Sequence, residues 1–395
     1  MVKEESGFLA GSGVAKVMVG TSAFGGLYSS MSEEACYEVV LRCLELGWRT
    51  FDTAPHYGLG ISEERLGKAL NRVWSLKKDV LFHLPTGVFT KVGRVVKNGD
   101  KTKETKQVDA NDGLFVDAPD DRYAVVDFTG PGVIESLAGS SRRLNLPGKK
   151  RLASNDERDV GGEKDDSLPL TPTIDGVRVH DPEISEEEAF RHAFHALKNF
   201  SPDVEVSIGT NECRVAEKAI PCVDAVLLAN RFNLLDQSGS RVLAECYERG
   251  KPVHLAGVYA SGLLAGGDTY GYSRCPDQTI LDKLNTWQRF LKSTPKFQSL
   301  TVKSLALAFA FVPLAVTHVV VGLRSKEQVD DTANMLSDLQ TYDDDFWFDL
   351  FTQARHKELI DPHAYHTIIE PRFLRARMKA AVNIQEAPEQ EEDDH

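Results

Sequence analysis

The stretch FDTAPHYGLGISEERLG (residues 51–67) places a carboxylate, Asp52, and a phenol, Tyr57, five residues apart among small residues. The pattern WRTFDTA (48–54) predicts a strand, and SEERLGKALNRV (62–73) predicts an amphipathic helix with Ser62 as its cap. A strand-to-helix connection needs neither an acid nor a phenol in order to fold. We therefore expect both groups to serve a chemical purpose that depends on which other residues meet them in space.

Strand and helix patterns alternate along the chain on both sides of this stretch. We expect eight strands, at residues 15–22, 48–54, 87–93, 174–182, 204–210, 223–230, 252–258 and 317–323. We expect helices at residues 32–47, 62–73, 132–144, 185–200, 211–220, 240–250, 297–312 and 325–336. Eight such units predict a (β/α)8 TIM barrel, a single α/β domain over residues 14–370 with its active site at the carboxyl ends of the strands. A doubly wound sheet is the competing architecture, but no GxGxxG follows the first strand.

Three polar stretches interrupt or follow the pattern, at residues 97–122, 145–171 and 385–395. All three are poor in aromatic residues, so we expect solvated, mobile segments, with a disordered acidic tail at 385–395. The stretch 145–171 lies between a helix and the next strand. We therefore expect it to be an inserted loop on the face of the barrel away from the chemistry.

Composition excludes several classes of function. The formal net charge of −13 argues against a nucleic-acid or anionic-membrane partner. The polar N-terminus does not resemble a secretory signal, and the longest apolar run, at residues 305–316, is too short to span a bilayer. The six cysteines form no CxxC pair and no metal-like spacing with histidine. We therefore expect a cytoplasmic protein without a metal site, either a monomer or a weak homo-oligomer.

Polar residues recur where the predicted strands end. Asp52, Lys91 and His180 each lie at the end of a strand, and Tyr57 follows Asp52 in the next loop. These four side chains should share one rim of the barrel, on neighbouring strands. A lysine ammonium beside a phenol favours the phenolate and lowers the phenol pKa, and Asp52 would keep that lysine charged. His180 could orient a carbonyl or hydroxyl oxygen next to Tyr57, which makes the group a proton-transfer device. It includes no activated serine or cysteine, so the partner reagent must be a cofactor.

The quoted stretch closely resembles the aldo-keto reductase superfamily, in particular its sugar-oxidising aldose 1-dehydrogenase branch. The same branch is matched by TKVGR (90–94), VHDP (179–182), LLDQS (234–238), SGLLAGG (261–267) and VVVGLRSKEQV (319–329). The resemblance implies a (β/α)8 barrel, a nicotinamide cofactor bound across its top, and a catalytic tetrad. By motif, that tetrad is Asp52, Tyr57, Lys91 and His180, the same four residues that the chemistry selects.

The resemblance also implies cofactor contacts beyond Asp52. They map to Gly20, Thr21, Thr210, Asn211, Ser261, Gly262, Leu263, Gly322, Leu323, Arg324, Ser325 and Gln328. Gly257, with Tyr259 nearby, stands where the family often has a nicotinamide-stacking aromatic residue. Gln328 stands where NADP-specific members have arginine, whereas Arg324 offers a fork for a 2′-phosphate. We therefore expect dual use of NADP and NAD.

Three functions remain open from the sequence. The first is oxidation of the anomeric carbon of an aldose to a lactone, with Tyr57 as general base. The second is NADPH-dependent reduction of an aldehyde or of pyridoxal. The third is a nicotinamide-binding redox sensor or regulatory subunit, against which the complete tetrad argues. We expect substrate choice between sugars or aldehydes to depend on loops after the strands and on residues 341–370, including Trp347, His363 and Tyr365.

Overall fold

The computed structural model describes residues 9, 16–81, 86–109, 113–146, 173–200, 202–273 and 276–375. Eight parallel strands close into a barrel in the order β1-β11-β10-β9-β8-β7-β3-β2. They are β1 (Lys16–Gly20), β2 (Thr50–Asp52), β3 (Gly87–Val92), β7 (Thr173–His180), β8 (Glu205–Thr210), β9 (Ala225–Ala229), β10 (Val253–Ala256) and β11 (Val316–Gly322). The prediction of a (β/α)8 barrel is confirmed.

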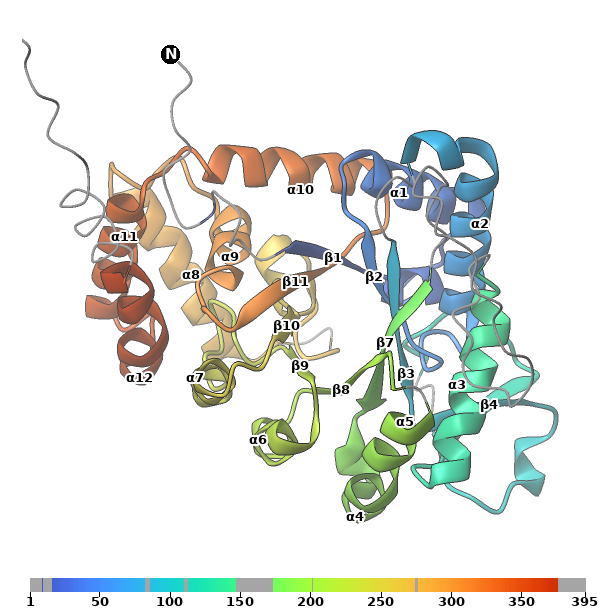
Figure 1. Ribbon diagram of the computed structural model, residues 1–395. Helices are drawn as coiled ribbons and strands as arrows, with labels where there is room; N and C mark the ends of the chain where they lie inside the picture. The colour runs from blue at the N-terminus through green and yellow to red at the C-terminus, as the bar shows by residue number, and fades with distance from the viewer. Residues whose placement is uncertain are drawn as a thin grey trace, which may run out of the picture.

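Helices form the outer layer of the barrel, as Figure 1 shows. They are α1 (Glu33–Glu45), α2 (Ile61–Leu81), α3 (Gly130–Leu144), α4 (Glu186–Glu188), α5 (Phe194–Phe200), α6 (Cys213–Ala219), α7 (Ser240–Glu248), α8 (Gln278–Ser293), α9 (Val302–Ala310), α10 (Lys326–Leu339), α11 (Asp344–His356) and α12 (Pro362–Ala364). The main hydrophobic core lies between this layer and the strands. Helices α8, α11 and α12 were not among the predicted helices.

The start of α2 differs from its prediction. The helix begins at Ile61, so Ser62 lies inside its first turn and is not its cap. The Ser62 hydroxyl is fully buried and donates to the carbonyl oxygen of Thr21 at 2.6 Å. It also lies 3.0 Å from the hydroxyl of Thr53. Ser62 therefore joins the ends of β1 and β2, the two strands that precede the candidate site.

The described part of the stretch 97–122 contains strands, which its polar composition did not predict. It belongs to a three-stranded sheet in the order β4-β6-β5, formed by β4 (Arg94–Asn98), β5 (Val108–Asp109) and β6 (Arg122–Val126). This sheet follows the carboxyl end of β3, beside the barrel (Figure 1). Val95, Phe115 and Ala124 are buried, so the segment has its own apolar contacts and can hold a fixed shape.

The other two polar stretches fall mainly or wholly outside the described residues. The description of the predicted insertion at 145–171 ends at residue 146, and the chain is described again from Thr173, the first residue of β7. The predicted acidic tail at 385–395 lies beyond residue 375. Both expectations therefore remain predictions.

Candidate active site

The structure brings the four predicted catalytic residues together. Strands β2, β3 and β7 are neighbours in the barrel, and they carry Asp52, Lys91 and His180 at their carboxyl ends. The Lys91 ammonium lies 2.6 Å from Asp52 Oδ2 and 3.0 Å from the Tyr57 hydroxyl. The ring of His180 meets the ring of Tyr57 edge-on, with centroids 6.1 Å apart.

The hydrogen bonds of Lys91 determine how the Tyr57 hydroxyl is oriented. A lysine ammonium has three donors and no acceptor. Lys91 donates one hydrogen to Asp52, one to the carbonyl oxygen of Thr53 at 2.8 Å, and one to the Tyr57 oxygen. Because Tyr57 accepts from Lys91, its own proton is free to be shared with a substrate oxygen.

Two glycines explain how the backbone holds Tyr57 in place. Gly58 adopts a φ of 66°, and a Cβ there would lie 2.4 Å from the carbonyl oxygen of Gly25. A Cβ on Gly25 would in turn lie 2.5 Å from the carbonyl carbon of Tyr57. The short 3₁₀ helix Ser22–Gly25 therefore packs directly on the backbone of the Tyr57 loop, which only glycine permits.

The pKa of Tyr57 differs from the sequence-based expectation. Burial raises it well above its ordinary value, and the charges of Asp52 and Asp181 act in the same direction. Arg178 and Arg94 offset this only in part. The structure contradicts the prediction of a lowered phenol pKa, because burial penalises the phenolate and the Asp52 carboxylate adds to that effect. The phenol is thereby kept in its protonated form.

The two basic groups beside Tyr57 are affected by the same burial. Burial lowers the pKa of Lys91, and the Asp52 carboxylate acts against that change. Burial also lowers the pKa of His180 well below its ordinary value, assisted by the positive charges of Arg94 and Lys91. The imidazole is therefore neutral near pH 7. Its Nδ1 atom is buried and has no hydrogen-bond partner among the described residues.

Arg178 is a charged residue of the site that sequence reasoning missed. It lies on β7, is fully buried, and donates from Nε to Asp52 Oδ1 at 3.0 Å. Its other nitrogens contact the hydroxyl of Ser207 at 2.9 Å and Nδ1 of His254 at 2.7 Å. Asp52 thus lies between two cations, Lys91 and Arg178. An arginine inside the apolar strand VRVHDP was the available signal.

A second missed contribution comes from the β4-β6-β5 sheet segment, residues 94–109 and 113–126. The ring of Phe115 stacks beside the Tyr57 ring, with centroids 5.8 Å apart. Backbone hydrogen bonds hold this part of the segment against the loop after β1, from Tyr28 to Leu114 and from Val116 to Gly26. The segment therefore forms a fixed wall of the site.

A cavity of about 720 Å³ opens at the carboxyl ends of the strands, and all four tetrad residues line it. Ten of the predicted cofactor contacts line the same cavity: Gly20, Thr21, Thr210, Asn211, Ser261, Gly262, Gly322, Leu323, Arg324 and Gln328. Two do not. Leu263 is part of the hydrophobic core, and the Ser325 hydroxyl caps α10 by accepting from the backbone of Gln328.

The lining of this cavity fits an extended nicotinamide nucleotide. A Cβ on Gly262 or Gly322 would meet no atom within 4 Å, so the backbone at both positions borders open space. Gly257 and Tyr259 both line the cavity, and the buried hydroxyl of Tyr259 has no hydrogen-bond partner among the described residues. The cavity reaches from Tyr57 to Arg324, so one ligand could contact both.

Arg324 also has a role in the protein itself. Its guanidinium donates to the carbonyl oxygens of Leu27 and Ser29, both at 2.9 Å. Its backbone N–H donates to the side chain of Gln328 at 2.9 Å. The cation thus joins the end of β11 to the loop after β1, at one end of the cavity.

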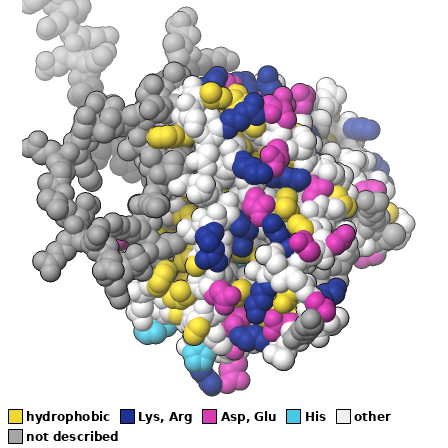
Figure 2. Space-filling model, turned by 90° about the vertical axis from the view of Figure 1, so that its right-hand side faces the viewer, with side chains coloured by type: hydrophobic (Ala, Val, Ile, Leu, Met, Phe, Trp, Pro, Cys, Tyr) yellow, Lys and Arg dark blue, Asp and Glu magenta, His cyan; other side chains and the backbone are white. Residues whose placement is uncertain are grey.

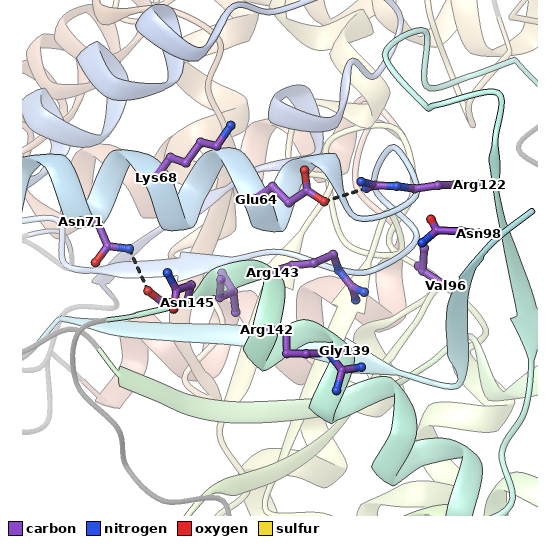
Figure 3. A pocket seen from close by; sticks show the side chains of 11 residues that line it. Glu64, Lys68, Asn71, Val96, Asn98, Arg122, Gly139, Arg142, Arg143 and Asn145 are labelled. Carbon is purple, nitrogen blue, oxygen red and sulfur yellow. Dashed lines mark hydrogen bonds and ion pairs between the residues drawn. The ribbon is translucent and has the colours of Figure 1, made fainter.

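A second cavity, of about 490 Å³, lies between α2, α3 and the β4-β6 strands (Figure 3). It contains four cations, but Arg122 pairs with Glu64 at 2.7 Å and Arg143 pairs with the buried Glu63 at 2.7 Å. Figure 2 shows basic and acidic side chains interspersed over one flank of the molecule. Two of the four cations of this cavity, Arg122 and Arg143, are therefore neutralised by carboxylates.

Three other features concern the expected partners and specificity. Trp347 and Tyr365 are packed in the core, His363 is exposed on α12, and none of the three lines the main cavity. Within the described ranges, no cluster of three or more His, Cys, Asp or Glu residues could hold a metal ion. In the same ranges, no helix combines the length and apolar character needed to cross a membrane.

Comparison with known proteins gives consistent matches over most of the chain. The model of the aldo/keto reductase family matches residues 16–128 and 171–349. D-threo-aldose 1-dehydrogenase from a Pseudomonas species is 27% identical over 344 residues, 84% of this chain and 92% of that protein. Pyridoxal 4-dehydrogenase from Microbacterium luteolum is 28% identical over 352 residues, 85% of this chain and 93% of that protein.

Solved structures with little sequence identity share the fold. A glycerol dehydrogenase from Gluconobacter oxydans superposes with a TM-score of 0.59 at 16% identity, covering 88% of this chain and 94% of that one. An aldo-keto reductase from Bacillus halodurans, in its holo form, superposes with a TM-score of 0.53 at 19% identity, covering 82% and 87%.

Proposed function

The chain belongs to the aldo/keto reductase family, and on that premise we propose that it is an NAD(P)-dependent aldose 1-dehydrogenase. It oxidises the anomeric carbon of an aldose to a lactone by hydride transfer. The observation that carries this proposal is the polar wall around Tyr57. His56, Asp181, Glu183 and Asn230 line the cavity together with the tetrad, so a polyhydroxylated substrate finds hydrogen-bond partners there. The similarity to D-threo-aldose 1-dehydrogenase supports the same substrate class.

The protein's own residues would divide the work as follows. The bound nicotinamide supplies the hydride acceptor. Tyr57 takes the proton of the anomeric hydroxyl, and the ammonium of Lys91, 3.0 Å away, stabilises the phenolate that has to form. Asp52 accepts a hydrogen bond from Lys91 and holds it in place, and Arg178 in turn holds Asp52 from the barrel interior. The neutral His180 orients the reacting oxygen beside Tyr57.

Cofactor binding is proposed for the ten cavity-lining residues named above, among which Arg324 would hold a 2′-phosphate. Leu263 and Ser325 would act indirectly, because one packs in the core and the other caps α10. We keep the expectation that both NADP and NAD are used.

A second candidate, reduction of an aldehyde, is favoured by one specific observation. The raised pKa of Tyr57 keeps the phenol protonated at neutral pH, and a protonated phenol is a general acid. The similarity to pyridoxal 4-dehydrogenase adds a non-sugar carbonyl compound to the possible substrates.

Initial rates with a panel of aldoses and either NAD+ or NADP+, beside a panel of aldehydes with NADPH, separate the two candidates. We expect turnover of at least one aldose, at a higher kcat/KM than any simple aldehyde. Turnover of aldehydes alone would replace the first proposal by the second.

The Tyr57→Phe variant tests the assigned chemistry in either direction. The substitution removes the hydroxyl alone, and general acid–base assistance contributes about 10²–10⁴-fold to a rate. We expect kcat to fall by that factor while cofactor dissociation constants, measured by quenching of Trp fluorescence, stay unchanged. A variant with near-normal kcat would refute the role of Tyr57.

A further inference from the structure

His56, the residue before Tyr57, contacts a carboxylate from outside the barrel strands. Its Nδ1 atom lies 2.9 Å from Asp109 Oδ2. Asp109 is the last residue of β5, an edge strand of the β4-β6-β5 sheet. Nδ1 forms no hydrogen bond of regular geometry, and the contact is a close electrostatic one between the ring nitrogen and the carboxylate. The side chains of His56 and Asp109 are only 21% and 16% exposed, which limits screening by solvent.

Asp109 is held in place by Arg94 and remains ionised. The Nε atom of Arg94 donates to Asp109 Oδ2 at 2.6 Å, and its Nη2 donates to Asp181 at 3.0 Å. Burial by itself raises the pKa of Asp109, but the His56 contact and the charge of Arg94 outweigh it and lower the pKa to about 2. The carboxylate therefore favours the tautomer of His56 that carries its proton on Nδ1.

That tautomer leaves the other ring nitrogen of His56 available. With a proton on Nδ1, Nε2 of the neutral imidazole is an acceptor. His56 lines the main cavity, and its Nε2 has no hydrogen-bond partner among the described residues. The His56 ring lies 6.0 Å from the His180 ring, which lies 6.1 Å from the Tyr57 ring. His56 thus lies beside His180, on the side of the tetrad, without being one of its members.

The β4-β6-β5 segment makes a second contact with the ring of His56, through an aromatic side chain. Phe115 meets it edge-on at 5.4 Å while stacking beside Tyr57. The segment therefore supplies a charge and an apolar contact to the same histidine.

We propose that His56, aligned by Asp109 and Arg94, binds a second hydroxyl of the substrate. This hydroxyl is on the carbon next to the one that carries the oxygen with which Tyr57 exchanges a proton. His56 is a substrate-binding residue, whereas Asp109 and Arg94 are positioning residues. The site would select α-hydroxy carbonyl compounds and aldoses over simple aldehydes. This inference rests on the proposed function in that the substrate is hydroxylated, but it holds for either direction of the reaction.

The test compares substrates that differ by one hydroxyl. Glyceraldehyde and propanal are reduced with NADPH, and an aldose and its 2-deoxy analogue are oxidised with NADP+. Each pair is assayed with wild type, His56→Phe and Asp109→Asn, which keep the ring and the side-chain shape respectively. Glu104→Gln is the matched control, because Glu104 pairs with Lys97 in the same segment and does not line the cavity.

We expect wild type to prefer the hydroxylated member of each pair. In His56→Phe and Asp109→Asn, kcat/KM for that member should fall about tenfold, the value of one hydrogen bond of ordinary strength. The kcat/KM for propanal and for the 2-deoxy analogue should stay within a factor of two, as should all values for Glu104→Gln.

Three results overturn the proposal: an unchanged preference in both variants, an equal loss for both members of a pair, and a wild type that prefers neither member. An equal loss would mean that the contact is merely structural. Failure of the proposed function looks different, because wild type would then leave every aldose unoxidised while still discriminating glyceraldehyde from propanal.

Discussion

At the scale of single residues, the main feature is that Asp52 has two cationic neighbours. Lys91 contacts one carboxylate oxygen and Arg178 the other, and all three side chains are buried. A charge buried without a partner is far more costly than one that is paired. Lys91 is therefore held by a group whose own position depends on an arginine inside the barrel.

Replacement of Arg178 by Met should destabilise the fold by about 3–5 kcal/mol, the range for breaking a buried ion pair. The variant leaves Ser207 and His254 without their contacts to the guanidinium and leaves Asp52 with Lys91 alone. Urea unfolding followed by Trp fluorescence measures the change. The control is Arg191→Met, because Arg191 forms an exposed ion pair with Glu187. This substitution should lower the free energy of unfolding by less than about 1 kcal/mol. Equal stability of the two variants would contradict the structural role of Arg178.

The raised pKa of Tyr57 predicts different pH profiles of kcat/KM for oxidation and for reduction. Oxidation needs the phenolate, whose fraction rises tenfold per pH unit below the pKa, so kcat/KM for oxidation should rise with a slope near one from pH 6 to pH 9. Reduction uses the protonated phenol and should be flat over that range. The folded pKa exceeds about 10, the value of a free phenol, so the stability that this group contributes is present below pH 10 and lost only above it. A flat oxidation profile would show that Tyr57 is not the base.

At the scale of elements, packing between two short turns determines where Tyr57 lies. The contact between Gly25 and Gly58 brings the turn after β1 against the loop after β2. The sequence showed these glycines, but their spacing of 33 residues gave no sign that they touch. Helix α2 is a second case in which a contact between distant residues could not be predicted from the sequence. The pattern predicted Ser62 as the helix cap, whereas its hydroxyl joins the ends of two strands.

Gly58→Ala should lower both the melting temperature and kcat. A methyl group there would lie 2.4 Å from the Gly25 carbonyl oxygen in a backbone conformation with φ of 66°, so the Tyr57 loop must shift. The strain is about 1–3 kcal/mol. Gly47→Ala is the matched control, because Gly47 also has positive φ, 79°, but no atom lies within 4 Å of the added carbon. We expect kcat to fall in Gly58→Ala alone, and an equal effect on kcat in both variants would rule out the contact as its cause.

At the scale of the whole molecule, the cavity is assembled across the closure of the barrel. Gly20 on β1 pairs with Gly322 on β11, and Arg324 reaches the loop that follows β1. Residues about three hundred positions apart in sequence therefore form one wall. This arrangement brings together the predicted cofactor segments at 20–21 and 322–328.

Arg324→Ala should weaken NADP+ by about ten- to hundred-fold, since a hydrogen bond to a charged group contributes about 1.5–3 kcal/mol. The binding of NAD+ should weaken by less, because NAD+ has no 2′-phosphate for Arg324 to bind. The loss of the Leu27 and Ser29 contacts affects both cofactors equally. Dissociation constants for each cofactor, by quenching of Trp fluorescence, measure the difference. Equal weakening would mean that Arg324 only holds the loop and does not bind a 2′-phosphate.

The alternation of strands and helices was enough to predict the barrel, because period-two and 3.6-residue patterns are local properties of the chain. The positions of Asp52, Tyr57, Lys91 and His180 followed from the rule that strand ends meet at one rim. The β4-β6-β5 segment was missed because its composition is polar and its order depends on long-range contacts, such as Phe115 with Tyr57 and Tyr28 with Leu114. Arg178 was missed because its partners lie on three other strands.

The pairing of the first strand with the last has a consequence for synthesis of the protein. A ribosome makes the chain from its N-terminus, so β1 emerges long before β11. Until β11 has left the exit tunnel, Gly20 lacks its neighbour Gly322, and β1 remains an open edge next to β2. The barrel can therefore close only after β11 has been made, and until then the pairing edge of β1 is available to other strands.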